Sequence, residues 1–245
     1  MLEELFDTCC AEVESGYESL GHTLGYRFLT GPRATLAHAT QIALITLNPG
    51  GGADSANQSG GSFEEGSSYV SESWLGQPAG RARLQLQIQA LFREIKAHAG
   101  FDGLVEDFLA AQVLTAHFIP FRSPSFKELK DPENSLEFGK SLWSRILLEW
   151  RPRLVVTIDR EAFFAIGQVI TKLGGRIAEY ERFPTGWGIY SCDASRYDGF
   201  RKDEVTVLAR LPHLSRFTLF SEPGYSGVRK AAMQPFFSWI TAHLR

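Results

Sequence analysis

The residues best suited to chemistry stand where four apolar segments of the chain end. Asn48 and His117 come at the ends of the first two segments, and Asp159 and His213 come at the ends of the last two. An amide can orient a water molecule, and an imidazole can hydrogen-bond to a polar ring or to a developing anion. Asp159 is the one carboxylate of the set, although a role as a helix N-cap before Arg160 explains it equally well. Such a set suits a heteroaromatic polar ligand better than redox or metal chemistry.

These residues can act together only if the four segments are neighbouring strands. The segments are residues 41–48, 110–121, 152–159 and 204–213, and helical patterns cover residues 2–20, 81–98, 135–150, 160–173 and 226–244. Strands that alternate with helices of this length indicate βαβ units and a parallel sheet. We therefore expect an α/β protein, a three-layer α/β/α sandwich around a central, mostly parallel sheet of about four strands. Ligands bind outside the carboxyl ends of such strands.

The chain has 245 residues and shows no repeat and no convincing linker. We expect a single domain over residues 1–245, with residues 1–35 as an N-terminal helical extension. Residues 50–80 are rich in Gly and Ser and poor in aliphatic residues. A connection of that length is unusual in a compact domain unless it is functional, so we expect an active-site loop there.

Composition limits the partners. The net charge is −3, so a polyanion would have to be met by a local basic patch. The three cysteines match no iron–sulfur pattern and the six histidines form no zinc motif, so we expect no metal and no organic cofactor. No apolar run approaches the ~20 residues that span a bilayer, and the acidic N-terminal segment is unlike a signal peptide. These features predict a cytoplasmic monomer that contacts no membrane.

Motifs for nucleotide cofactors and for serine hydrolases do not fit. The glycines of "NPGGGADSANQSGG" lack the spacing of a dinucleotide-binding fingerprint, and no lysine follows them as a phosphate-binding loop requires. The serine-hydrolase motif Gly-x-Ser-x-Gly is absent, and the nearest segment, "PGYSGV" at 223–228, follows no expected strand. Asn48, and not the glycines that follow it, is therefore the candidate functional residue of this segment.

Four segments resemble the motifs of the uracil-DNA glycosylase superfamily, closest to its mismatch-specific uracil- and thymine-DNA glycosylases. They are "TLNPGGG" (46–52), "LTAHFIPFRSPSFKEL" (114–129), "RPRLVVTIDREAFFAIG" (151–167) and "LPHLSRF" (211–217). The segments occur in the family's order and span roughly residues 40–245. The resemblance implies a hydrolase of base-excision repair, which cleaves the N-glycosidic bond of a uracil-like base flipped out of DNA.

The resemblance also implies roles for individual residues. Asn48 would position the attacking water and His213 would stabilise the departing base, whereas in isolation Asn-Pro simply begins a turn. His117 stands where the family has an Asn that reads the pyrimidine edge, but a histidine among apolar residues is as often a core histidine. Trp74 would stack on the base, with Phe63 and Tyr69 as alternatives for this role, or else it would pack its loop onto the sheet. The remaining base-binding positions are Leu47, Pro49 and Gly50.

Contacts to DNA would come from four residues near the same strand ends, namely Arg122, Ser215, Arg216 and Phe217. Ser215 would hold a phosphate of the flipped nucleotide or cap the next turn, and a solvated surface charge is the simpler explanation of each arginine taken alone. The alternative function is a protein on the same fold that binds a base, nucleoside or nucleotide without cleaving it. An unrelated α/β enzyme acting on a small polar ligand is a more distant third hypothesis.

Overall fold

A computed structural model describes the chain except for residues 1, 38–39, 52–58, 203, 221–224 and 245. Its centre is one sheet of six strands in the order β2-β1-β3-β6-β5-β4. The strands are β1 (Ile42–Thr46), β2 (Val113–His117), β3 (Leu154–Thr157), β4 (Arg176–Pro184), β5 (Ser191–Arg201) and β6 (Glu204–Arg210). The first four in the sheet run parallel, and β5 and β4 run antiparallel to their neighbours. The α/β class is confirmed, but the sheet is mixed and larger than the expected four strands.

The two unexpected strands form a hairpin at the edge of the sheet. Nearly all of β4 is exposed or half-buried, and its sequence, RIAEYERFP, carries charges on both faces. In β5, buried polar side chains such as Asp193 and Ser195 interrupt the apolar pattern. Asp193 is buried because it pairs with Arg182 and Arg210. Charged edge strands of this kind prevent unwanted pairing between chains, and they lack the hydrophobic alternation that marks a strand in a sequence.

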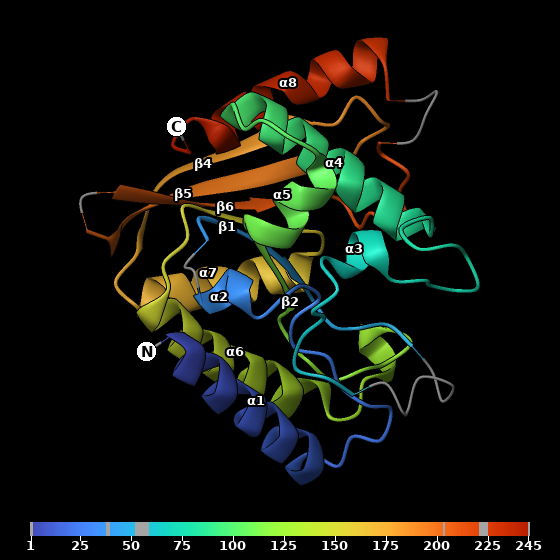
Figure 1. The fold of residues 1–245 in the computed structure, drawn as a ribbon. Helices are drawn as coiled ribbons and strands as arrows, with labels where there is room; N and C mark the ends of the chain where they lie inside the picture. Colours follow the sequence, from blue (N-terminus) through green and yellow to red (C-terminus); the bar gives the residue numbers. More distant parts are fainter. Residues whose placement is uncertain (1, 38–39, 52–58, 203, 221–224, 245) are drawn as a thin grey trace.

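Helices cover both faces of the sheet (Figure 1). One face carries α1 (Leu2–Ser19), α6 (Pro132–Glu149) and α7 (Arg160–Lys172). The opposite face carries α3 (Ser68–Ser71), α4 (Arg83–Ala99), α5 (Val105–Ala111) and α8 (Gly227–Thr241). Each of the five predicted helical segments coincides with one of these helices to within a few residues. No helix in the described part of the chain is long and apolar enough to cross a bilayer.

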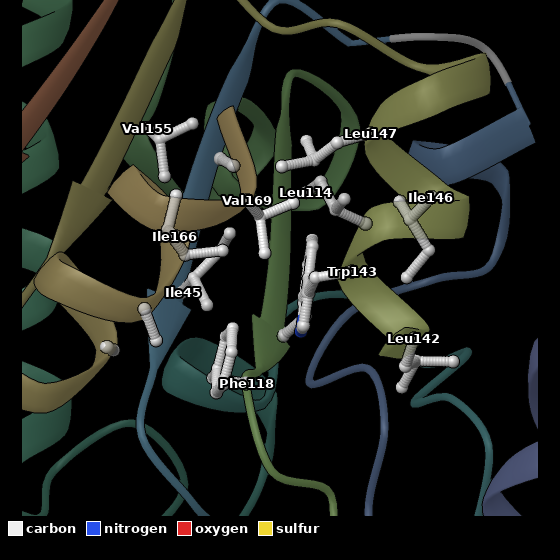
Figure 2. Packing of buried hydrophobic residues seen from close by; sticks show 14 of the residues in the cluster. Ile45, Leu114, Phe118, Leu142, Trp143, Ile146, Leu147, Val155, Ile166 and Val169 are labelled. Carbon is white, nitrogen blue, oxygen red and sulfur yellow. The ribbon is translucent and has the colours of Figure 1, made fainter. Parts of the chain in front are cut away.

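The four parallel strands are mostly apolar because both of their faces are covered. Ile45 and Leu114 point to the α6–α7 side, where they meet Trp143 and Ile166 (Figure 2). Trp143 is fully buried, and its indole N–H donates to the carbonyl of His117 at 3.3 Å. Burial of a side chain of this size contributes several kcal/mol, on the order of 3–5 by the cost of its truncation. The core therefore also anchors the end of β2, where the candidate site begins.

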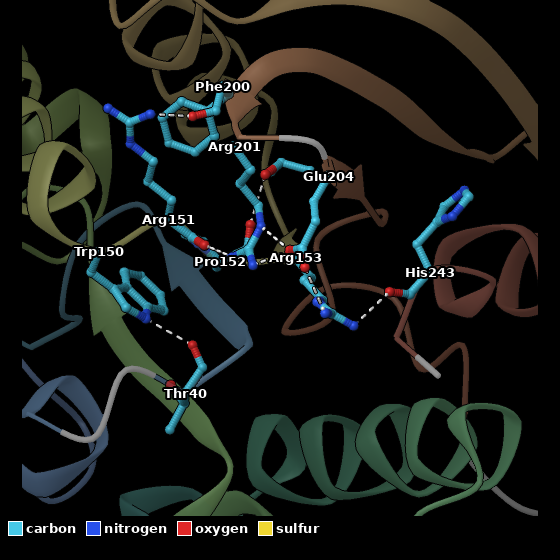
Figure 3. A network of polar contacts seen from close by, with 10 residues as sticks. Thr40, Trp150, Arg151, Pro152, Arg153, Phe200, Arg201, Glu204 and His243 are labelled. Carbon is cyan, nitrogen blue, oxygen red and sulfur yellow. Dashed lines mark hydrogen bonds and ion pairs between the residues drawn. The ribbon is translucent and has the colours of Figure 1, made fainter.

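A polar network holds the opposite ends of the strands (Figure 3). The indole N–H of Trp150 donates to the carbonyl of Thr40 at 2.7 Å, just before β1. Arg153, just before β3, pairs with Glu204 at 2.9 Å, at the start of β6. Arg201 pairs with the same carboxylate. These contacts hold the amino ends of the parallel strands together. The candidate residues lie at the other ends of the same strands, their carboxyl ends.

Residues 28–30 line the outer edge of β2, and residues 60–68 hydrogen-bond in turn to residues 26–31. Leu29 bridges Ala116 in antiparallel fashion, and the Leu29 N–H donates to the Gly61 carbonyl at 2.9 Å. Gln85 of α4 donates to the carbonyls of Ser68 and Glu72, both at 2.7 Å. The described part of the expected loop over residues 50–80 is therefore tied to the sheet and to α4 along its length. Residues 52–58 of that loop lie outside the described residues.

Candidate functional site at the strand ends

The register of the parallel strands places the candidate residues on one edge. Thr46 pairs with His117, Ile45 pairs with Thr157, and Thr157 pairs with Arg210. The ends of β2, β1, β3 and β6 therefore lie side by side in that order, with neighbouring strands about 4.8 Å apart. Asn48, His117, Asp159 and His213 each lie within three residues of one of these ends. The predicted convergence of the strand ends is confirmed.

Asn48 is half-buried and held by its amide nitrogen. This nitrogen donates to Ser123 Oγ at 2.9 Å and lies 3.2 Å from the carbonyl oxygen of Pro49. Ser123 Oγ donates its own proton to the carbonyl of Ser125 at 2.8 Å, so it serves Asn48 as an acceptor. The carbonyl oxygen of the Asn48 amide accepts no hydrogen bond from the described residues. The side chain is thus oriented by its nitrogen and keeps one acceptor for a ligand or water.

Hydrogen bonds join the loop after β1 to the loop after β2. The Ile119 N–H donates to the carbonyl of Leu47 at 2.7 Å, and the Ser123 N–H donates to that of Pro49 at 3.2 Å. Arg122 Nη1 donates to the Gly50 carbonyl at 2.9 Å. Leu47 is half-buried, Pro49 is buried and Gly50 is exposed. The predicted base-binding backbone therefore lies in a fixed path, and only its glycine is open to solvent.

His117 is buried, and its Nδ1 shares a hydrogen bond of 2.7 Å with Thr46 Oγ1. Burial, together with the nearby cations Arg122 and Arg27, holds the pKa of His117 well below its usual value. The imidazole is therefore neutral at physiological pH. A neutral ring with one nitrogen bound keeps a single nitrogen, Nε2, for another polar partner. His117 is thus a buried histidine that stands at the carboxyl end of β2, beside the other candidate residues.

Trp74 is held by a neighbouring ion pair. Its indole N–H donates to Glu72 at 2.6 Å, and its ring packs edge-on against Tyr69 at 5.4 Å. Glu72 also forms an ion pair of 2.7 Å with Arg27. The ring is half-buried and packs its loop against the core, in agreement with the structural interpretation of this residue. Tyr69 is one of the aromatic residues that the sequence offers beside Trp74, whereas nothing in the spacing of the sequence indicates Arg27 or Glu72.

His213 lies in a tight turn after β6. Its carbonyl accepts the N–H groups of Arg216 and Phe217, both at 3.0 Å, and its Nδ1 shares a hydrogen bond of 2.7 Å with Ser215 Oγ. Desolvation and the positive charge of Arg216 lower the pKa of His213. The adjacent Leu214 is fully buried and anchors the turn to the core. The turn therefore presents a neutral imidazole whose orientation is fixed by Ser215.

A hollow of about 370 Å³ opens beside His213. Asp159, Arg210, Tyr190 and Phe217 line it together with His213. Neither Asn48 nor His117 is among its described lining residues. The strand ends thus carry two neighbouring groups of residues, Asn48 with His117 at the ends of β1 and β2, and Asp159 with His213 at the ends of β3 and β6.

Asp159 combines the two roles that its sequence position suggests. Its Oδ1 accepts the Ala162 N–H at 2.7 Å and so caps α7. The side chain is also buried, and the backbone N–H of Leu47 faces the same carboxyl group across from β1. Burial is the main cause that raises the pKa of Asp159 to about 7, and the nearby Glu161 adds to it. Asp159 is therefore a helix cap whose buried carboxyl group also lines the hollow.

The predicted DNA-contacting residues are placed unequally. Arg122 is buried, and its hydrogen bond to Gly50 gives it a role in holding the loop. Ser215 and Arg216 are exposed. Phe217 is half-buried, and its ring centre lies 4.4 Å from that of Tyr190 and 5.6 Å from that of Trp187. Only the last three residues lie where a long ligand could reach them, so a direct phosphate contact by Arg122 stays an untested prediction.

The comparisons add no family assignment, because no protein-family model matches the chain and no curated protein is similar to it at a significant level. Among the described residues, no group of three or more His, Cys, Asp or Glu side chains could hold a metal ion. A function for the chain is therefore inferred from the geometry of the strand ends and from the four sequence motifs.

Proposed function

We propose that this protein is a DNA glycosylase that hydrolyses the N-glycosidic bond of a uracil-like base flipped out of DNA. The observation that carries the proposal is the placement of Asn48. Its amide is fixed by Ser123 at the carboxyl end of a central strand, and its carbonyl oxygen is left as an acceptor. The same strand ends supply two imidazoles, those of His117 and His213. The pKa values of both histidines are lowered. The attacking water and the base of the substrate can thus be bound by different side chains of the site.

Asn48 orients the attacking water in this mechanism. An amide is no base, but its carbonyl oxygen can accept a hydrogen bond from water and direct the lone pair of that water toward the anomeric carbon. N-glycosidic cleavage passes through a state with oxocarbenium character, so a weakly activated water suffices when the base departs as a stabilised anion. Positioning of the two reactants replaces much of the chemical activation.

His213 stabilises the departing base. When the Ser215 hydroxyl donates to Nδ1, the neutral ring carries its proton on Nε2 and can donate it in a hydrogen bond to a base oxygen as negative charge develops. The lowered pKa keeps this ring neutral, so it needs no proton from solvent for this task. His117 reads the base edge with its Nε2, because its Nδ1 is engaged by Thr46.

Phe217 and the exposed Arg216 contact the DNA around the flipped base in this mechanism. The chain is net acidic, so any attraction to phosphate has to be local. Arg216 is exposed in the turn, and the side chain of Arg83 donates to its carbonyl at 2.8 Å, which brings a second cation to the same rim. A half-buried aromatic ring between such cations suits contact with an unstacked base.

A second candidate function is binding of a base, nucleoside or nucleotide without cleavage. One observation favours it, since Asn48 and His213 do not line the same described hollow. In that case the two groups of residues would each bind part of a ligand, with no shared reaction centre. The two functions predict different products from the same incubation.

The proposal is tested with oligonucleotides that carry uracil or thymine opposite guanine, hypoxanthine or xanthine. The protein is used in excess over DNA, and alkali-labile abasic sites are counted over time. We expect abasic product from at least one substrate, and we expect Asn48→Ala to abolish it. Asn134→Ala is the matched control, because it removes the same amide from the exposed first turn of α6. Tight binding of these substrates without product would support the second candidate and contradict the first.

A further inference from the structure

We propose that Asp159 is the catalytic base of this site, which accepts a proton from the water that Asn48 orients. The inference deepens the proposed glycosylase function and rests on it. It assigns a chemical role to Asp159, the one carboxylate among the four candidate residues at the strand ends. Asn48 is an amide, which cannot accept the proton that hydrolysis releases.

The position of Asp159 is set by strand register. Ile45 pairs with Thr157, so Leu47 lies opposite Asp159, and the Leu47 N–H faces its carboxyl group. Asn48 follows Leu47 in the loop after β1. On the other side of β3, Leu211 donates its N–H to the Thr157 carbonyl at 2.9 Å, and Leu211 lies two residues before His213. Asp159 thus lies between the backbone segment that leads to Asn48 and the segment that leads to His213.

The surroundings of Asp159 favour a proton acceptor that works near neutral pH. The side chain is 7% exposed, yet it lines the hollow and so remains open to a ligand. The charged groups that face it are Glu161 on α7 and Arg210 on β6, and His213 lines the same hollow. Burial outweighs the backbone N–H groups and Arg210, and it places the pKa of the carboxyl group at about 7. A general base is most effective when its pKa lies near the working pH.

The proposed step is a displacement at the anomeric carbon by water. The water oxygen forms a bond to the anomeric carbon as the bond from that carbon to the base nitrogen breaks. The electron pair of the broken bond leaves with the base, which His213 hydrogen-bonds as an anion. The proton from the water passes to the Asp159 carboxylate and is later released to solvent. No cofactor or second reactant is required.

Capping of α7 does not account for these features. An N-cap needs only an acceptor for one backbone N–H, and Asn serves as well as Asp in that position. Asp131, the N-cap of α6, is exposed and lines no described hollow. Asp159 has the same capping role but is buried at the strand ends. Substitution by Asn therefore keeps an acceptor for the cap and removes the capacity to accept a proton, although it leaves one acceptor oxygen fewer for the Leu47 N–H.

The test compares wild type, Asp159→Asn and the matched control Asp131→Asn, each in excess over an oligonucleotide that wild type cleaves. Base release is measured between pH 5.5 and 8.5, and affinity for the same DNA is measured by fluorescence anisotropy. We expect wild-type release to rise with pH and to level off above about 7. Asp159→Asn should be slower by about 10²–10³-fold at pH 8 and lose this pH dependence, with affinity unchanged within about twofold. Asp131→Asn should behave as wild type.

A second measurement does not depend on catalysis. Selective ¹³C labelling of aspartate carboxyl groups follows their titration by NMR, and Asp159→Asn identifies the signal of Asp159. We expect one carboxyl group to titrate near pH 7. A titration near pH 4, or Asp159→Asn release within twofold of wild type with the same pH profile, would overturn the role of Asp159 and leave the glycosylase function standing. Absence of base release by wild type on every substrate would overturn both, even if Asp159 titrates near pH 7.

Discussion

The amide nitrogen of Asn48 donates a 2.9 Å hydrogen bond to Ser123 Oγ, and this contact joins the loop after β1 to the loop after β2. Ser123 lies 75 residues further along the chain, yet the parallel pairing of β1 with β2 brings it beside Asn48. The orientation of the Asn48 side chain is thereby set before any substrate arrives. Preorganised polar groups of this kind supply a large part of enzymatic rate enhancement.

Ser123→Ala should slow base release by about tenfold, the effect of losing about 1.4 kcal/mol of hydrogen bonding that positions Asn48. The loss should be smaller than that of Asn48→Ala, because the carbonyl oxygen of Asn48 is still present. Single-turnover rates at saturating protein measure both. Ser125→Ala is the control, since its hydroxyl belongs to the same loop but bonds to Glu128 instead. Equal rates for the Ser123 and Ser125 variants would show that the contact does not position Asn48.

His213→Ala should slow release of uracil by about 10²–10³-fold, the usual cost of removing one donor to a developing anion. The loss should be smaller for 5-fluorouracil, because a base that is a more stable anion depends less on the donor. Ser215→Ala should give an intermediate effect, since the His213 ring is then no longer oriented through Nδ1. Rates on both substrates for the three proteins give the comparison. An equal loss on both bases would argue against stabilisation of the leaving group.

His117 should make the folded protein sensitive to acid. Its folded pKa is well below the unfolded value of about 6.5, so the unfolded state binds the proton more readily. Stability conferred by the neutral ring is fully present above about pH 6.5 and is lost as the pH falls. Between pH 8 and pH 5, wild type should lose about 2 kcal/mol more than His117→Gln in urea unfolding. Parallel curves for the two proteins would mean that His117 is not held neutral.

Phe217→Ala should weaken affinity for uracil-containing DNA by about five- to 150-fold, which is the equivalent of the 1–3 kcal/mol of base–aromatic stacking. Fluorescence anisotropy with labelled oligonucleotides measures the change. Phe164→Ala is the control, since Phe164 is an exposed phenylalanine on α7 that lies away from the cluster of Phe217 with Tyr190 and Trp187. A similar effect of both substitutions would assign the loss to general surface hydrophobicity.

The central part of the fold could be predicted because its signals are local. β1 and β3 are short apolar runs between turn residues, and α4 and α7 repeat apolar residues at helical spacing. The β4–β5 hairpin could not be predicted in this way. Its buried polar residue, Asp193, is satisfied by Arg210 from another strand, and such a pairing leaves no periodic trace in the sequence.

The site shows the same division. Asn48 and His213 were found from motif order, because each follows an apolar run directly. Ser123, Arg27 and Glu72 were missed as site residues, since their roles depend on contacts between distant segments. The two interpretations of Asp159 were indistinguishable in the sequence, because burial of its carboxyl group is a property of the folded sheet.

The central claim is that Asn48 directs water to a sugar carbon. The most direct test counts free base and abasic sites together, by mass spectrometry and alkaline cleavage, after one incubation of uracil-containing DNA with excess protein. Wild type should yield the two products in equal amounts, Asn134→Ala should match it, and Asn48→Ala should yield neither while it still binds the DNA. Equal product from wild type and Asn48→Ala, or none from wild type on any damaged base, would contradict the account.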